Sequence, residues 1–192
     1  VFRVGSWAEA ESLLRRCQQG DEAALTELMR MYQGRVFECT LRVSSDSSMA
    51  EEATVDCFYR VWTKCRQKRE GTNLESWIFR IALRAVLDVA RKRQRWWKRL
   101  ATGSRTTEHD LQSGPLETLI ESEKQQQLAN DVAAAIETLK EEDRALVHLY
   151  YFEGRALADI AEILETSRDV LKMRLQRARK RLGTLLKAAD DE

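Results

Sequence analysis

The sequence has little that would interrupt a helix. Its 192 residues include one proline, Pro115, and eight glycines, so turns that need these residues are few. No apolar run approaches the roughly 20 residues of a membrane-spanning helix, and no signal-peptide pattern is visible. We therefore expect a cytoplasmic protein without membrane insertion.

Residues that usually hold metals or perform catalysis are also scarce. The four cysteines form no CxxC motif and no Cys/His pair with ligand-like spacing, and there are only two histidines. No nucleophile–base pattern and no glycine-rich phosphate loop is present. We expect no metal, no cofactor and no enzymatic activity, and we interpret the cysteines as small buried thiols in a reducing compartment.

What the sequence does contain is typical of a helical protein. Apolar residues make up 43% and charged residues 33% of the chain, and apolar side chains recur at helical spacing. Residues 101–114 are polar, with Gly, Ser and Thr, as in a flexible linker. We predict an all-α fold of two small helical domains, a bundle over 1–99 and a helix-turn-helix domain over 116–192, joined by a linker over 100–115.

Charge is segregated along the chain although the net charge is only +1. The segment "RKRQRWWKR" (91–99) is basic, 108–143 is strongly acidic, and 168–187 is basic again. One interpretation is structural, because cations favour helix C-termini and charged helix faces are solvated. The other is a polyanionic partner such as nucleic acid.

The second domain ends in a helix-turn-helix pattern. "ALADIAEIL" (156–164) is amphipathic, Thr166 and Ser167 can cap the next helix, and an apolar seam follows at Leu171, Leu175, Ala178 and Leu182. Two short helices joined by a tight turn can place the second helix in a DNA major groove. Basic side chains there can neutralise phosphates, and Arg or Gln can read base edges.

Three ordered segments carry a family resemblance: "AEEATVDCFYRVW" (50–62), "LESWIFRIALRAVLDVARKR" (74–93) and "YYFEGRALADIAEILETSRDVLKMRLQRARKRL" (150–182). Together they resemble bacterial sigma factors of the extracytoplasmic-function (ECF) group, group 4 of the housekeeping-type sigma family. The resemblance implies a promoter-melting region 2 over 1–99 and a region 4 over 116–192. It further implies binding to core RNA polymerase, promoter-directed transcription initiation and control by an anti-sigma factor.

The same resemblance assigns residues to three surfaces. The clamp helices of the largest polymerase subunit would contact Glu51, Glu52 and Asp56. The minus-ten promoter element would contact Lys68, Arg69, Asn73, Trp77, Arg80, Arg84, Asp88, Arg91 and Lys92. The minus-thirty-five element would contact Arg155, Arg168, Lys172, Met173, Arg174, Gln176, Arg177 and Arg179, with Lys172, Met173 and Gln176 reading bases.

Four positions depart from the usual family pattern. Val55 replaces Gln in the clamp segment, and Arg84 replaces Asn on the minus-ten helix, which predicts altered minus-ten preference or stronger non-specific strand binding. Glu165 occupies a turn that commonly carries Gly, at a cost if its backbone is left-handed. Met173 replaces a small polar residue and favours apolar contact, such as with a thymine methyl group.

The alternative is a polymerase-independent helix-turn-helix regulator whose N-terminal bundle serves as an interaction module. A plain repressor needs neither an acidic clamp segment nor a second basic helix, so this alternative leaves both unexplained.

Overall fold

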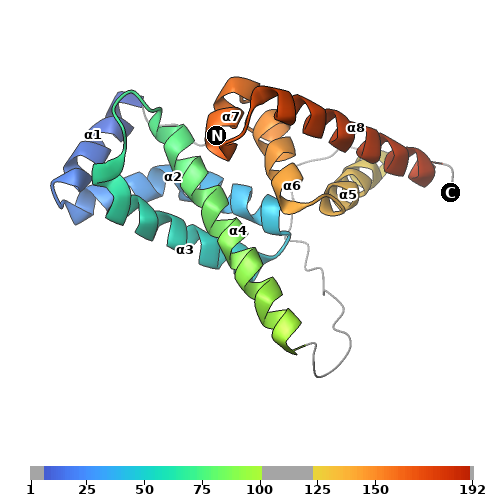
Figure 1. The fold of residues 1–192 in the computed structure, drawn as a ribbon, viewed down its shortest axis with the longest axis horizontal. Helices are drawn as coiled ribbons and strands as arrows, with labels where there is room; N and C mark the ends of the chain where they lie inside the picture. Colours follow the sequence, from blue (N-terminus) through green and yellow to red (C-terminus); the bar gives the residue numbers. More distant parts are fainter. Residues whose placement is uncertain (1–6, 101–122, 191–192) are drawn as a thin grey trace. The chain divides into compact units, whose positions relative to one another are not determined.

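The computed structural model describes residues 7–100 and 123–190, and these ranges are helical and contain no β-strand (Figure 1). The chain divides into two compact units, one within Val1–Asp110 and one within Leu111–Glu192. The predicted all-α fold is confirmed. The segment predicted as a linker lies, apart from Leu100, outside the described residues. Over the described ranges, no helix combines the length and the apolar character needed to cross a membrane.

The first unit is a bundle of α1 (Trp7–Gln18), α2 (Glu22–Ser44), α3 (Ser47–Lys64) and α4 (Leu74–Leu100), with a 3-10 turn, η1 (Cys65–Gln67), after α3. Side-chain caps define where three of these helices begin. Asp21 accepts from the Ala24 amide at 3.1 Å, Asp46 from Met49 at 2.9 Å and Asn73 from Ser76 at 3.0 Å.

The core of this unit is centred on α4, which packs against both α2 and α3. Apolar side chains of α4 that recur at helical spacing are buried at Ile78, Ile81, Ala82, Ala85 and Val89, whereas Trp77 is half-buried. The structure also buries Phe79, Leu83 and Val86 on the same helix, because α4 has neighbours on more than one side. Toward its C-terminal end, α4 has no buried residue over 91–96, and five of these six residues are exposed.

The second unit contains α5 (Glu123–Glu137), α6 (Glu141–Val147), a π-helical segment η2 (His148–Phe152), α7 (Leu157–Leu164) and α8 (Arg168–Asp190). The predicted helix-turn-helix is confirmed as α7 and α8. Ser167 caps α8 by accepting from the Val170 amide at 3.3 Å. Glu165 ends α7 in the left-handed conformation with φ 51°, the strained geometry anticipated for this turn.

Packing of the second unit follows the predicted seam of α8. Leu171, Leu175 and Ala178 are buried, and Leu182 is half-buried. On α7 the sequence pattern predicted one buried face of Leu157, Ile160, Ala161 and Leu164, whereas the buried residues are Ile160 and Ile163. This short helix contacts both η2 and α8, which moves its buried side toward Ile163.

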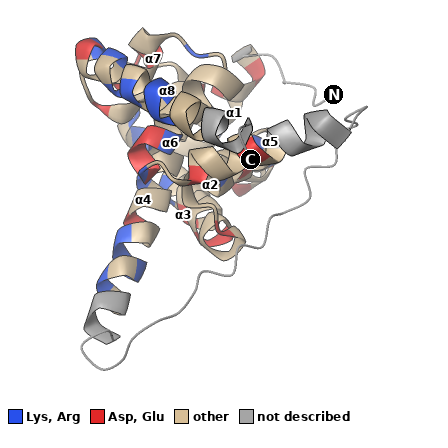
Figure 2. Ribbon diagram, turned by 90° about the vertical axis from the view of Figure 1, so that its right-hand side faces the viewer, with Lys and Arg blue, Asp and Glu red and all other residues tan. Residues whose placement is uncertain are grey.

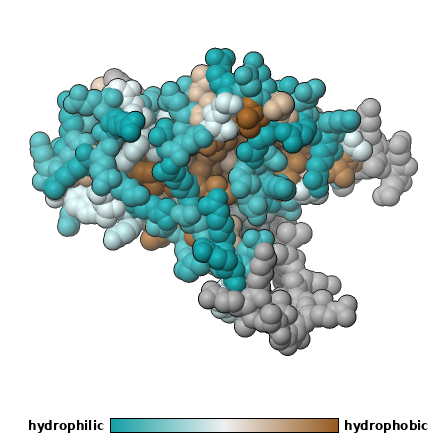
Figure 3. Space-filling view, in the orientation of Figure 1, coloured by the Kyte–Doolittle hydropathy of each residue, from teal (hydrophilic) through white to brown (hydrophobic). Residues whose placement is uncertain are grey.

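Hydrophilic residues predominate on the face drawn in Figure 3, where hydrophobic residues occupy smaller areas. The apolar side chains that remain strongly exposed are therefore informative, and several of them lie at the surfaces described next.

Candidate protein and nucleic-acid binding surfaces

A groove of about 740 Å³ lies between α3 and α4 in the first unit. Its acidic side belongs to α3, and α4 contributes charges of both signs; the lining includes Glu51, Glu52, Val55, Asp56, Tyr59, Asp88 and Lys92. The three residues predicted to bind polymerase are therefore brought together on one wall. Glu51 and Glu52 are exposed, and Asp56 is half-buried.

Two apolar side chains stand out at this groove. Val55 is 71% exposed and Tyr59 is 67% exposed. Because they are four residues apart on α3, they lie on the same face of the helix, one turn from each other. An aromatic ring flanked by carboxylates suits a partner helix that offers apolar and basic side chains. Sequence reasoning missed Tyr59, although its spacing from Val55 was a usable signal.

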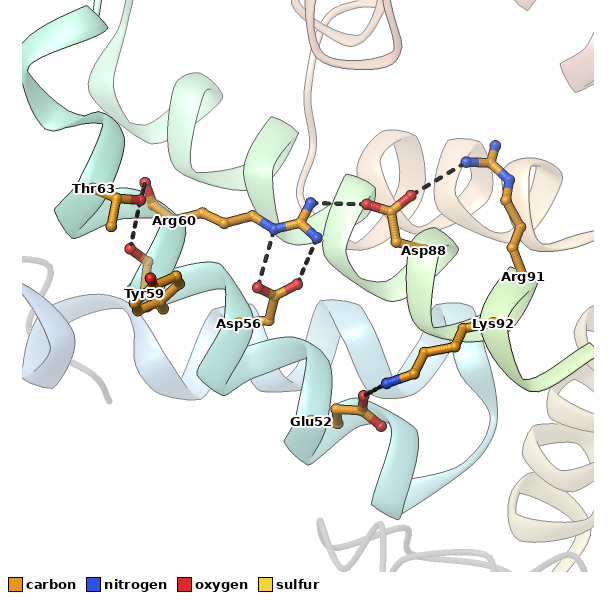
Figure 4. Close-up of polar contacts among 8 residues, drawn as sticks. All are labelled: Glu52, Asp56, Tyr59, Arg60, Thr63, Asp88, Arg91 and Lys92. Carbon is orange, nitrogen blue, oxygen red and sulfur yellow. Dashed lines mark hydrogen bonds and ion pairs between the residues drawn. The ribbon is translucent and has the colours of Figure 1, made fainter. Parts of the chain in front are cut away.

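Arg60 joins the two walls of the groove (Figure 4). Its guanidinium makes a bidentate contact with Asp56, with Nε–Oδ1 at 3.1 Å and Nη2–Oδ2 at 2.7 Å. Its Nη1 donates to Asp88 Oδ2 on α4 at 2.9 Å, and Asp88 Oδ1 lies 3.5 Å from Arg91 Nη1. We call these four residues the Arg60 network. Burial alone would lower the pKa of Arg60, but the hydrogen bonds that Arg60 donates to Asp88 and Asp56 outweigh this effect and raise that pKa above its ordinary value.

The basic face of α4 carries most of the predicted minus-ten residues. Lys and Arg gather along the C-terminal part of this helix, and again along α8 (Figure 2). Arg84, Arg91 and Lys92 are exposed, whereas Trp77 and Arg80 are half-buried. Lys92 Nζ lies 3.4 Å from Glu52 Oε1, a second ion pair between α4 and the acidic wall of the groove.

The loop before α4 is held in place by α1. Lys68 Nζ pairs with Glu11 at 3.1 Å, and its side chain is only 7% exposed. Gln18 Nε2 donates to the Cys65 carbonyl, and Arg66 Nε donates to the Gln18 carbonyl, both at 2.9 Å. Three contacts therefore fasten η1 and the start of the loop to the first helix.

The three loop residues predicted to contact the minus-ten element differ in whether their polar atoms already have a partner within the unit. Lys68 is turned toward Glu11, and Asn73 accepts the amide that begins α4. Arg69 is exposed. The geometry makes Arg69 the side chain best placed for an external ligand, while Lys68 and Asn73 shape the loop.

The exposed face of α8 contains Lys172, Met173, Gln176 and Arg177, and Arg168 lies exposed at its first turn. Met173 is 53% exposed, unusual for a methionine outside a binding surface. Lys172 Nζ lies 3.8 Å from the highly exposed Asp169, a weak surface pair. Lys172, Met173, Gln176, Arg177 and Arg168 are thus exposed and accessible to a ligand.

Two arginines of α8 are instead bound within the second unit. Arg174 Nε donates to Asp143 Oδ1 of α6 at 2.7 Å, and both side chains are about one-quarter exposed. Arg179 Nε donates to the Tyr151 hydroxyl at 2.5 Å, which raises the pKa of Arg179, and its guanidinium also lies over the Tyr150 ring. Arg155 is half-buried. Sequence spacing could not reveal these partners, because Asp143 and Tyr151 are 31 and 28 residues away.

All four cysteine side chains are buried, as predicted, and none of them forms a disulfide bond. Burial raises the pKa of the Cys57 thiol to about 12 and that of Cys17 to about 11, so both are poor nucleophiles. Among the described residues, no cluster of three or more His, Cys, Asp or Glu side chains could hold a metal ion.

Comparison with known proteins gives two family matches. Residues 28–96 match the family model described as Sigma-70 region 2, and residues 129–182 match Sigma-70, region 4. These matches contain α3 with the acidic wall, most of α4, and the helix-turn-helix.

Curated relatives share low identity over most of the chain. An ECF RNA polymerase sigma factor SigE of Mycolicibacterium smegmatis is 28% identical over 170 residues, which cover 87% of this chain and 64% of that protein. ECF RNA polymerase sigma factor SigW of Bacillus subtilis is 22% identical over 181 residues, covering 91% of this chain and 95% of that protein.

Two solved structures share the fold. CnrH, determined in complex with the cytosolic domain of CnrY, superposes with a TM-score of 0.65 at 18% identity, covering 94% of this chain and 98% of that chain. The sigma factor RpoE of Bartonella quintana, in complex with the anti-sigma factor NepR, gives a TM-score of 0.64 at 24% identity, covering 84% of this chain and 96% of that chain.

Proposed function

Because this chain belongs to the ECF group of the sigma-70 family of transcription initiation factors, we propose that it binds core RNA polymerase and directs it to specific promoters. The observation that carries this proposal is the pairing, within one unit, of an acidic groove containing exposed apolar side chains with a basic helix face. A repressor that acts without polymerase has no use for that groove.

Core polymerase engages the groove. Glu51, Glu52 and Asp56 supply charges for basic side chains of the clamp helices of the largest subunit, while Val55 and Tyr59 supply the apolar centre. An exposed aromatic anchor surrounded by charges is a common source of binding energy in protein interfaces. Val55, although a departure from the family pattern, strengthens the apolar part of this surface.

The minus-ten element lies against α4 and the loop before it. Arg84, Arg91 and Lys92 are exposed and suited to backbone phosphates. Trp77 and Arg69 are positioned for unpaired bases of the opened strand. Arg80, Asp88, Lys68 and Asn73 support these contacts from within the unit, because their polar groups are half-buried or bound to neighbouring residues.

The minus-thirty-five element lies in contact with α8. Lys172, Met173 and Gln176 face outward from the seam and read base edges, with Met173 suited to a thymine methyl group. Arg168 and Arg177 contact phosphates. Arg174, Arg179 and Arg155 lie beside this surface. Because Arg174 is bound to Asp143 and Arg179 to Tyr151, their first role is to stabilise the unit that presents the surface.

The division of labour follows the chain, with region 2 over 1–99, a linker over 100–115 and region 4 over 116–192. The protein acts in the cytoplasm and performs no catalytic step, since polymerase carries out the chemistry. One structural relative, RpoE, was determined with an anti-sigma factor, and CnrH was determined with the cytosolic domain of CnrY. We propose that an anti-sigma factor covers the groove and DNA-binding faces of this chain.

The proposal is tested by in vitro transcription with core polymerase on a pool of randomised promoters. We expect the chain to pull down core polymerase and to enrich promoters with defined minus-ten and minus-thirty-five elements. Failure to bind core polymerase, together with binding to duplex DNA by the chain alone, would instead support the polymerase-independent regulator.

Paired variants test the division of labour. Lys172→Glu with Arg177→Glu should abolish transcription that depends on the minus-thirty-five element while polymerase binding is retained. Loss of polymerase binding in this variant would contradict the separate roles of the two units.

A further inference from the structure

We propose that Arg60 couples occupancy of the α3–α4 groove to the charge that α4 presents, so that a partner cation bound at Asp56 weakens the hold of Asp88 on Arg91. This inference rests on the proposed function, because it takes the groove as the polymerase site and Arg91 as a phosphate contact. Arg60 is a positioning residue in this scheme.

The geometry supplies a continuous row of alternating charges. Asp56, Arg60, Asp88 and Arg91 are linked by contacts of 2.7, 2.9 and 3.5 Å, from the groove wall to the basic face (Figure 4). Side-chain exposure rises along the same row, from 25% at Arg60 to 49% at Asp88 and 60% at Arg91. The strongest link is therefore at the Arg60 end, and the weakest is at Arg91.

Electrostatics gives the direction of the coupling. A cation that binds Asp56 competes with Arg60 for that carboxylate, so the guanidinium of Arg60 interacts more strongly with Asp88. Asp88 then neutralises Arg91 less. The Asp88–Arg91 contact is long and exposed, which makes it the link that changes most readily.

Linkage requires the effect to be reciprocal. A phosphate that draws Arg91 away from Asp88 lets Asp88 hold Arg60 more tightly and leaves Asp56 more open to a partner cation. Polymerase and promoter DNA would thus each favour the binding of the other through this row of four side chains.

A second bridge runs parallel to the first. Lys92 lies on the basic face and pairs with Glu52 of the groove wall at 3.4 Å. A partner cation bound at Glu52 would compete with Lys92 for that carboxylate, and Lys92 would then be free to contact a phosphate. This bridge does not pass through Arg60, so removing Arg60 should leave its contribution in place.

A merely structural Arg60 would tie α3 to α4 without transmitting anything. A structural role and a coupling role of Arg60 predict different results in a double-mutant cycle between the ends of the row, Asp56→Asn and Arg91→Gln. We would measure the dissociation rate of the promoter open complex formed by the full chain with core polymerase, for each single variant and the double variant.

With Arg60 present, we expect the two substitutions to be non-additive by about two- to fivefold, the range of one exposed ion pair. In an Arg60→Met background they should become additive. Arg60→Lys, which keeps the charge and the aliphatic stem but loses the bidentate geometry, should reduce the coupling to an intermediate value. It serves as the second variant if Arg60→Met does not fold.

The matched control is Glu51→Gln with Arg91→Gln. Glu51 lines the same groove but is outside the Arg60 network, so this pair should be additive with or without Arg60. Additivity of Asp56→Asn and Arg91→Gln in the presence of Arg60 would overturn the inference, as would coupling that survives Arg60→Met. If the unmodified chain does not bind core polymerase, the proposed function fails and the inference falls with it.

Discussion

Arg174 and Arg177 of α8 offer a test of whether structure, rather than charge count, selects the phosphate contacts. Both are arginines on one helix, three residues apart, and Arg→Gln removes the same charge from each. Arg174 is bound to Asp143 at 2.7 Å and about one-quarter exposed. Arg177 is exposed, and its Nε makes a long contact of 3.4 Å to the Met173 carbonyl.

The expected magnitude follows from counterion release. Each phosphate contact contributes about 0.9 to the slope of log affinity against log salt. Raising salt from 50 to 200 mM therefore weakens binding by about 3.5-fold per contact. The affinity ratio between the unmodified holoenzyme and the Arg177→Gln holoenzyme should fall by about this factor over that range, whereas the ratio for Arg174→Gln should change little.

Stability should respond in the opposite way. Arg174→Gln removes a partly buried charged hydrogen bond between α8 and α6, which we expect to lower the free energy of unfolding by about 1 kcal/mol. Arg177→Gln should change it by less than about 0.5 kcal/mol.

The assays are fluorescence anisotropy of a promoter fragment titrated with holoenzyme at several salt concentrations, and urea unfolding of the full chain. If Arg174→Gln lowers the salt slope as much as Arg177→Gln and leaves unfolding unchanged, then the Asp143 contact does not occupy Arg174 and our assignment of phosphate contacts is wrong.

Three further changes test other parts of the structure. Replacing Glu51, Glu52 and Asp56 together by Ala should weaken core polymerase binding at least tenfold, about 1.4 kcal/mol, in a competition pull-down. Helix content measured by circular dichroism should be unchanged. Normal polymerase binding would refute the clamp assignment. Glu165→Gly should raise the free energy of unfolding by about 0.5–1 kcal/mol because glycine tolerates positive φ, and a loss of stability would show that the side chain matters more than the backbone. Asp46→Ala should lower the free energy of unfolding by about 1 kcal/mol or more, because the α3 cap is lost. Asp46→Asn keeps the cap but not the Arg93 ion pair at 2.6 Å, so it should lower this free energy by less. Equal losses in the two variants would count against the cap.

Local sequence patterns were enough to predict the all-α fold and the helix-turn-helix. Caps such as Asn73 and Ser167 act over three residues, and the α8 seam repeats at helical spacing, so both can be read without a structure. For Glu165 a cost was predicted only on condition of a left-handed backbone, and the φ of 51° meets that condition.

Long-range partners were beyond that reasoning. Lys68 looks like a free cation in a basic loop until Glu11, 57 residues earlier, is brought beside it. Arg174 similarly acquires Asp143, and α4 acquires neighbours on more than one side that bury Phe79. Helix periodicity identifies which face of a helix points away from the core. It does not identify which charged side chains on that face form ion pairs with another element.

The attachment of the loop to α1 has a consequence for how this domain may be divided. The match to region 2 begins at residue 28, which leaves out α1. With α1 go the Glu11 carboxylate that pairs with Lys68, the Gln18 side chain that donates to the Cys65 carbonyl, and the Gln18 carbonyl that accepts from Arg66. A fragment that begins at the edge of the family match would keep every α4 side chain assigned to DNA. It would lose the contacts that attach η1 and the loop before α4 to α1. The functional boundary of this domain therefore lies upstream of its recognisable sequence.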